Sequence, residues 1–439
     1  MTILPGITFC TRTWSQYRTL KPLHVSNPAS QSLKKNENLW FSILSIIFFL
    51  SIWSVIIFLK LHFDAPHYQT VDGDYYFLLA EKIRNGQDFV IEGIKNIAGK
   101  PFSPYPPGYP LLLCAAIAFE KFFQISAVLF LHSLLLFMLG FVWIIKKLPT
   151  FSLITICFTD TFMELACNQW SEFSFIIFLI LIGIWISGLE FKNKPQFPLV
   201  FSAIFFSVFL IRYAGVFLAV FIVLKLWQNF KQKAHFRFWI LTGFGFGSLV
   251  LLWFIIEIFV YGQATGGDRY ANGQTASRLA FDLMIGLFDQ IFLLKDWSGS
   301  SVPSFGLSLF FIGLFLIWAL IFSTAKTINY EKEDSINMLT GNNLIYIGIV
   351  YFSFIIPLRW YFYFAEGFDL RLLGPGAILV LLGCSIRFFD RFEIRKKMLF
   401  ICLWVLVSSF FSLPKKAMYL KFQEGIWGNT STIFPQSSQ

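Results

Sequence analysis

Residues 39–61 read LWFSILSIIFFLSIWSVIIFLKL, and this long apolar run decides the fold class. Roughly 20 such residues cross the hydrocarbon core of a bilayer, so the run predicts a transmembrane helix. The residues before it are polar and include Arg12, Arg18 and Lys21. A cleavable signal peptide would place its apolar stretch close to a short basic start. We therefore expect the run to remain in the protein as its first span.

The composition extends this expectation to the whole chain. Of the 439 residues, 56% are hydrophobic and only 14% are charged, whereas soluble domains carry about a quarter charged residues. The chain is therefore expected to be an all-α polytopic membrane protein with about eleven spans. The expected spans lie near 39–61, 124–145, 151–168, 172–190, 197–211, 213–229, 238–261, 305–324, 342–358, 372–387 and 398–413.

The charges of the loops predict the orientation. Basic residues, which give the chain its net charge of +10, gather in alternate short loops such as 146–147 and 231–237. Because basic loops face the cytoplasm, we expect a cytoplasmic tail over 1–38. The membrane domain would cover 39–413 with outer loops 62–123 and 262–304, and a short tail, 414–439, would lie outside. This pattern indicates membrane topology and no nucleic-acid partner. The six cysteines show no CxxC spacing and are interpreted as small apolar residues.

The first outer loop carries two candidate catalytic carboxylates. Residues 72–80 read DGDYYFLLA, and residues 105–110 read YPPGYP, a stiff turn that launches a helix. A carboxylate at a membrane surface can act as a general base when its surroundings tune its pKa. The alternative is that Asp74 caps a helix that begins just after it. The four-residue spacing to Tyr76 favours Asp72 as the base, with Asp74 as cap or supporting acid.

Further charged residues interrupt the apolar runs on the expected outer side. Glu164 and Glu172 flank a short polar break, and acidic residues there are costly unless paired or functional. Arg212, Arg269 and Arg371 depart from the positive-inside pattern, and arginine is suited to phosphate binding. The alternative interpretations are a helix-start carboxylate for Glu172 and interfacial snorkelling for the arginines.

These motifs, in their order along the chain and their expected placement on the outer side of the membrane, resemble those of the GT-C superfamily of membrane glycosyltransferases. The resemblance is closest to the branch with protein mannosyltransferases, aminoarabinose transferases and rhizobial core transferases, and it runs from about residue 40 to residue 390. The matching features are at 72–80, 106–110, 170–172, 212–215 and 371–375. Each feature is short, and their common order carries the resemblance.

The resemblance implies an inverting transferase. The sugar donor would be a polyprenyl-phosphate-linked sugar, and the acceptor a hydroxyl group of a lipid, glycan or protein. Asp72 or Asp74 would deprotonate that hydroxyl. Arg212, Arg269 and Arg371 would stabilise the leaving phosphate.

The resemblance also bears on the substrate contacts, the metal and the membrane. Glu172 and Tyr109 would be substrate-binding residues. Metal dependence varies in the superfamily, so a divalent metal stays open, although the five histidines show no ligand spacing and no metal site is predicted. The protein is expected in a bacterial inner membrane, with its active site on the periplasmic face.

Two features depart from the family pattern. Gly73 separates two acidic residues that are adjacent in many relatives, and no soluble outer domain is expected after the last run. Two other function classes remain open. A transporter or flippase of lipid-linked glycans would show internal repeats, and none is found. A non-catalytic envelope-assembly protein would be favoured by a degenerate first loop, but both carboxylates are present.

Overall fold

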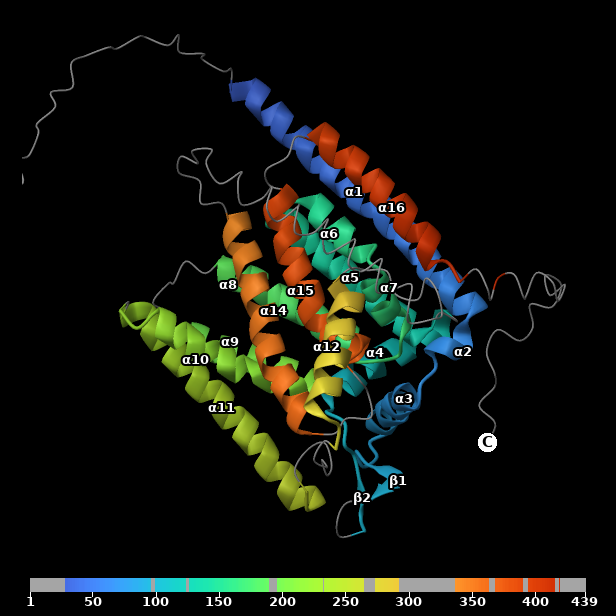
Figure 1. Ribbon diagram of the computed structural model, residues 1–439, viewed down its shortest axis with the longest axis vertical. Helices are drawn as coiled ribbons and strands as arrows, with labels where there is room; N and C mark the ends of the chain where they lie inside the picture. Colours follow the sequence, from blue (N-terminus) through green and yellow to red (C-terminus); the bar gives the residue numbers. More distant parts are fainter. Residues whose placement is uncertain are drawn as a thin grey trace, which may run out of the picture.

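The computed structural model of the chain describes residues 28–95, 99–123, 126–188, 196–231, 233–263, 273–291, 336–362, 368–389, 394–414 and 418. Within these ranges the protein is almost entirely α-helical, with one antiparallel two-stranded sheet. Figure 1 shows the helices gathered in one bundle, with strands β1 and β2 projecting at its lower edge.

The elements that the structure describes follow one another along the chain. They are α1 (Pro28–Phe63), α2 (Ala65–Tyr68), α3 (Val71–Arg84), β1 (Ile91–Lys95), β2 (Pro101–Phe102), α4 (Gly108–Phe123), α5 (Ala127–Ile145), α6 (Thr150–Cys157), α7 (Asp160–Cys167), α8 (Glu172–Ser187), α9 (Gln196–Ile211), η1 (Tyr213–Val216), α10 (Phe217–Gln228), α11 (Lys233–Tyr261), α12 (Ala276–Ile291), α14 (Ile336–Tyr361), α15 (Leu370–Phe389) and α16 (Ile394–Ser412).

Several of these helices are long and apolar enough to cross a membrane, as expected for a polytopic helical membrane protein. They cover Trp40–Phe63, Ala127–Ile145, His235–Tyr261, Ile336–Tyr361 and Leu370–Phe389. The count of about eleven spans is not confirmed, because α8, α9, α10 and the apolar part of α16 are shorter. The expected span at 305–324 lies outside the described residues.

The expected single span at 151–168 is instead two helices, α6 and α7, bent by 66°. The last carbonyls of a helix have no partner within it, and here side chains of α16 supply hydrogen bonds. Trp404 Nε1 donates to the carbonyl oxygen of Thr155 at 3.0 Å, and Ser408 Oγ donates to that of Phe158. The break in this segment is therefore stabilised by the last helix of the chain.

Helix α8 forms the centre of the bundle. Its side chains are apolar on every face, a pattern typical of a helix that is buried all round, and almost all of them are buried. It contacts α5, α7, α9, α14 and α15. Because α8 begins at Glu172, the start of the central helix also carries a charge that needs compensation.

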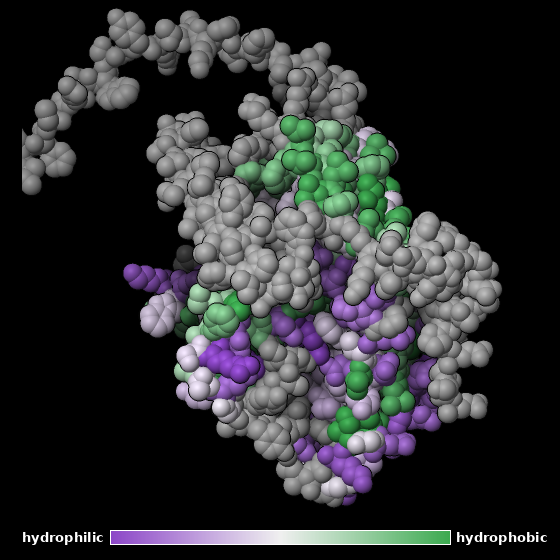
Figure 2. Space-filling model, turned by 45° about the vertical axis from the view of Figure 1, so that its right-hand side comes forward, coloured by the Kyte–Doolittle hydropathy of each residue, from purple (hydrophilic) through white to green (hydrophobic). Residues whose placement is uncertain are grey.

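The outer helices present apolar side chains on their free faces. On α16 these are Leu399, Leu403, Leu406 and Phe410, each at least 60% exposed and spaced as one helical stripe. Figure 2 shows apolar side chains gathered over the upper part of the molecule, whereas hydrophilic ones are frequent toward the lower end. A continuous apolar face of this kind fits contact with lipid.

The segment expected to form the first outer loop folds against the bundle as α2, α3, the β1–β2 hairpin and α4 (Figure 1). The hairpin was not expected from the sequence, and its register pairs Ile91 with Phe102.

Helix α3 begins at Val71 and not near Tyr75, because the side chain of Thr70 caps it and accepts a hydrogen bond from the Gly73 amide. The cap role expected for Asp74 is therefore wrong. Helix α1 begins at Pro28, and the part of it that is apolar enough to cross a membrane covers Trp40–Phe63, next to the expected boundary at residue 38.

The first residue of α4, Gly108, packs directly against the end of α9. A Cβ atom on Gly108 would lie 2.6 Å from the carbonyl group of Leu210 and 2.7 Å from the amide nitrogen of Ile211. Only glycine allows two backbones to approach so closely. The next residue after Ile211 is Arg212, so this contact helps to position an arginine that belongs to the candidate site.

We predict that Gly108→Ala destabilises the protein by about 1–3 kcal/mol, the usual cost of overpacking. Thermal unfolding in detergent would show a lowered Tm. Gly93→Ala is the matched control, because a Cβ atom there has no neighbour within 4 Å. Equal Tm values for the two variants would contradict the proposed backbone contact.

Candidate functional site

Asp72 lies in the first turn of α3 and faces the bundle. Tyr76 and Ala80 follow it at four-residue spacing, and both are buried, so this face of α3 is directed inward. The Asp72 side chain itself is 26% exposed. Asp74, two residues later, is exposed on the other side of the helix. Of the two carboxylates, only Asp72 therefore contacts the charged residues of the bundle.

The turn between α7 and α8 holds the start of α3 in place. A Cβ atom on Gly73 would lie 2.7 Å from Cβ of Gln169, so glycine is required for this approach. Trp170 Nε1 donates a hydrogen bond of 2.8 Å to Oγ1 of Thr70, the residue that caps α3. These contacts bring Asp72 close to Glu172 at the start of α8.

Glu172 is fully buried and pairs with two arginines. Its Oε1 atom accepts a hydrogen bond of 2.9 Å from Nε of Arg371 and forms an ion pair with Nη1 of Arg212. Arg212 follows α9, and its Nη2 atom also donates to the backbone carbonyl of Arg371 at 3.4 Å. Three chain segments thus meet at one carboxylate, which would be costly to bury without these partners.

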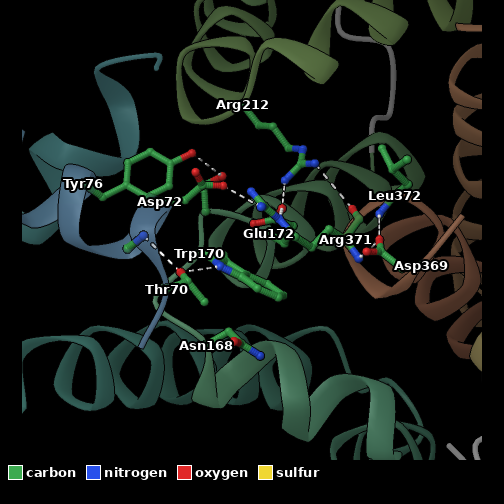
Figure 3. Close-up of polar contacts among 12 residues, drawn as sticks. Thr70, Asp72, Tyr76, Asn168, Trp170, Glu172, Arg212, Asp369, Arg371 and Leu372 are labelled. Carbon is green, nitrogen blue, oxygen red and sulfur yellow. Dashed lines mark hydrogen bonds and ion pairs between the residues drawn. The ribbon is translucent and has the colours of Figure 1, made fainter. Parts of the chain in front are cut away.

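Arg371 links the two carboxylates, as Figure 3 shows. Its Nη1 atom lies 2.5 Å from Oδ2 of Asp72, while its Nε atom binds Glu172. The guanidinium group lies over the ring of Trp170, 4.6 Å from the ring centroid, a stacking arrangement that favours arginine over lysine. Asp369 accepts hydrogen bonds from the amides of Arg371 and Leu372 and so caps the start of α15. These contacts fix the plane and position of the guanidinium group.

Tyr105 completes the surroundings of Asp72. Its hydroxyl donates a hydrogen bond of 2.6 Å to Oδ1 of Asp72, and its ring contacts the ring of Tyr76. Burial, together with this hydrogen bond and the charge of Asp72, raises the pKa of Tyr105. The phenol therefore stays protonated near neutral pH and remains a donor. A carboxylate beside an arginine can serve chemically as a base next to an anion-binding group.

The structure brings together four of the predicted site residues, Asp72, Glu172, Arg212 and Arg371. It does not bring Tyr109 to them: Tyr109 is fully buried behind Tyr76, with its hydroxyl 3.5 Å from Nε2 of His132. Arg269 lies outside the described residues. Tyr105 and Trp170 belong to motifs quoted above, but their side-chain roles were not predicted.

A second ion-pair cluster joins α1 to α7. Lys60, 3% exposed near the end of α1, places its Nζ atom 2.5 Å from Oε1 of Glu164 and 3.8 Å from Oδ1 of Asp160. Tyr68 donates to the same Glu164 oxygen at 3.3 Å. The cluster connects α1 and α2 to α7. It therefore joins the segment that precedes α3 to the segment that precedes α8. The signal for it in the sequence was a lysine inside an apolar run.

We predict that Lys60→Met destabilises the protein by about 1–3 kcal/mol, because the half-buried carboxylate of Glu164 loses its ion pair with the buried ammonium group. Lys82→Met is the control, since Lys82 pairs at 3.6 Å with Glu92, whose side chain is 86% exposed. Denaturant-induced unfolding in detergent micelles measures both. A loss for Lys60→Met no larger than that for Lys82→Met would mean that the cluster contributes little stability.

Comparison with protein-family models, curated proteins and solved structures gave no match. Among the residues that the structure describes, no group of three or more His, Cys, Asp or Glu side chains is placed to hold a metal ion. The chemistry of the site therefore has to be inferred from its four charged residues and their surroundings.

Proposed function

We propose that the protein is an integral membrane glycosyltransferase of the GT-C type that uses a polyprenyl-phosphate-linked sugar as donor. The strongest support is the ion pair between Asp72 and Arg371. Arg371 and Arg212 also pair with the same carboxylate, that of Glu172. A base and an anion-binding group are the two parts that transfer from a phosphate-linked sugar requires. The base lies in the first turn of α3, and the two arginines lie at the ends of apolar helices.

The proposed reaction assigns one role to each part. Asp72 takes the proton of the acceptor hydroxyl, whose oxygen then attacks the anomeric carbon of the sugar. The bond between that carbon and the phosphate oxygen breaks, and polyprenyl phosphate leaves with the bonding electrons. Arg371 and Arg212 stabilise the negative charge that grows on the phosphate. Attack opposite the leaving group inverts the anomeric centre.

The surroundings of the site fit a lipid-linked donor. Arg371 lies in the first turn of α15, one of the helices long enough to cross a membrane, and Arg212 lies between two shorter apolar helices. A phosphate at this level would leave its polyprenyl chain in the hydrocarbon region. The acceptor, a hydroxyl of a lipid, glycan or protein, would approach from the side of α3 and Tyr105.

We predict that Asp72→Asn lowers sugar transfer by at least about 100-fold, as expected when a general base is lost. Asp74→Asn should retain most of the activity, because Asp74 is exposed and points away from Arg371. Transfer is measured in membranes supplied with a labelled polyprenyl-phosphate sugar and candidate acceptors. Glu81→Gln, an exposed change on the same helix, is the control for altered charge. Full transfer by Asp72→Asn would rule out this base.

We also predict that the site faces the outer side of the membrane. The new thiol of Asp88→Cys, beyond the end of α3, should react with a membrane-impermeant maleimide added to intact cells. The new thiol of Lys231→Cys, after α10, should react only after the cells are permeabilised. Both native residues, Asp88 and Lys231, are exposed. The opposite labelling pattern would reverse the proposed orientation.

A further inference from the structure

The four charged side chains of the site balance one another. Asp72 and Glu172 contribute two negative charges, and Arg212 and Arg371 contribute two positive charges. Each arginine already contacts a carboxylate. A phosphate ligand would bring additional negative charge, so it needs a cation that is released from its present partner.

The two carboxylates differ in how firmly they are held. Glu172 has no exposed side-chain surface, and both arginines bind its Oε1 atom. Asp72 is 26% exposed and contacts one arginine and one neutral hydroxyl, that of Tyr105. An anion that approaches from solvent or from the membrane surface would therefore exchange with Asp72 and leave Glu172 in place.

Arg371 can change this partner without leaving its position. Its Nε atom is bound to Glu172, its plane lies over Trp170, and its amide is held by Asp369. The Nη1 atom is the one that contacts Asp72. A planar guanidinium group can bind one anion through Nε and another through its terminal nitrogens. The Nε side of the Arg371 guanidinium group is thus fixed by Glu172, while the anion bound at its Nη1 atom can be exchanged.

We propose that Asp72 occupies an anion site of Arg371 in the ligand-free protein, and that the phosphate group of an anionic amphiphile displaces it. This inference rests on the proposed function in one respect: if Asp72 is the base, then binding of the donor also frees the base. A carboxylate that loses a guanidinium partner becomes a stronger proton acceptor. Donor binding would then activate Asp72 before an acceptor hydroxyl is deprotonated.

The test is a binding measurement on the full-length protein in uncharged detergent, with monododecyl phosphate as the probe. Asp72→Asn should bind the probe more tightly than the wild type, by about 5-fold to 150-fold, the usual range of coupling between two ligands. Arg371→Lys should bind it more weakly, because lysine cannot form the paired contacts of a guanidinium group. In the double variant Asp72→Asn/Arg371→Lys, the gain from Asp72→Asn should be smaller.

Controls separate this effect from general changes. Glu81→Gln removes one exposed negative charge from the same helix and should leave the affinity unchanged. Inorganic phosphate, tested in parallel, shows whether the site takes a free anion or requires the alkyl chain. Dodecyl glucoside, which carries no charge, should not distinguish Asp72→Asn from wild type. Thermal unfolding confirms that each variant is folded.

The outcomes also separate this inference from the proposed function. If Asp72→Asn binds monododecyl phosphate no more tightly than the wild type, Asp72 does not compete for Arg371 and the inference is overturned. If the affinity rises but the wild type transfers no sugar from any polyprenyl-phosphate donor, the anion site stands and the proposed function fails. If the wild type transfers sugar and the affinity of Asp72→Asn does not rise, the proposed function stands and the inference about Asp72 fails.

Discussion

The burial of one carboxylate at the start of the central helix governs the arrangement of the site. Glu172 has no exposed side-chain surface, and the nearest charges that compensate it are those of Arg212 and Arg371. Removing a charge from water costs several kcal/mol unless a partner is in contact. The helix ends that carry the two arginines must therefore meet at this point. Once they do, Arg371 also reaches Asp72.

The same constraint joins parts of the chain that are far apart in sequence. Asp72 and Arg371 are separated by 299 positions, and Arg371 and Glu172 by 199. Around them, Trp170 contacts both the cap of α3 and the guanidinium group of Arg371. The site thus depends on helix termini and turns, while the apolar interior of α8 supplies the rigid support behind it.

Much of the site could be predicted because charge is rare in this chain. Glu172, Arg212 and Arg371 each interrupt an apolar run, where an unpaired charge is costly and therefore informative. The role of Thr70 as helix cap, the hairpin β1–β2 and the bend between α6 and α7 could not be predicted in this way. The hairpin includes a strand of only two residues, and the bend depends on contacts with α16. The Thr70 cap is a local contact with the Gly73 amide, but it involves no charged residue that would mark it. The pairing of Lys60 with Glu164 also spans 104 positions.

The bend between α6 and α7 has a consequence for the order in which the protein can be completed. The carbonyls of Thr155 and Phe158 at this break accept hydrogen bonds from Trp404 and Ser408 in the last helix. Away from water a carbonyl without a hydrogen-bond partner costs several kcal/mol. During synthesis α6 and α7 emerge long before α16 exists. The carbonyls of Thr155 and Phe158 therefore lack these hydrogen-bond partners until α16 has been inserted beside them.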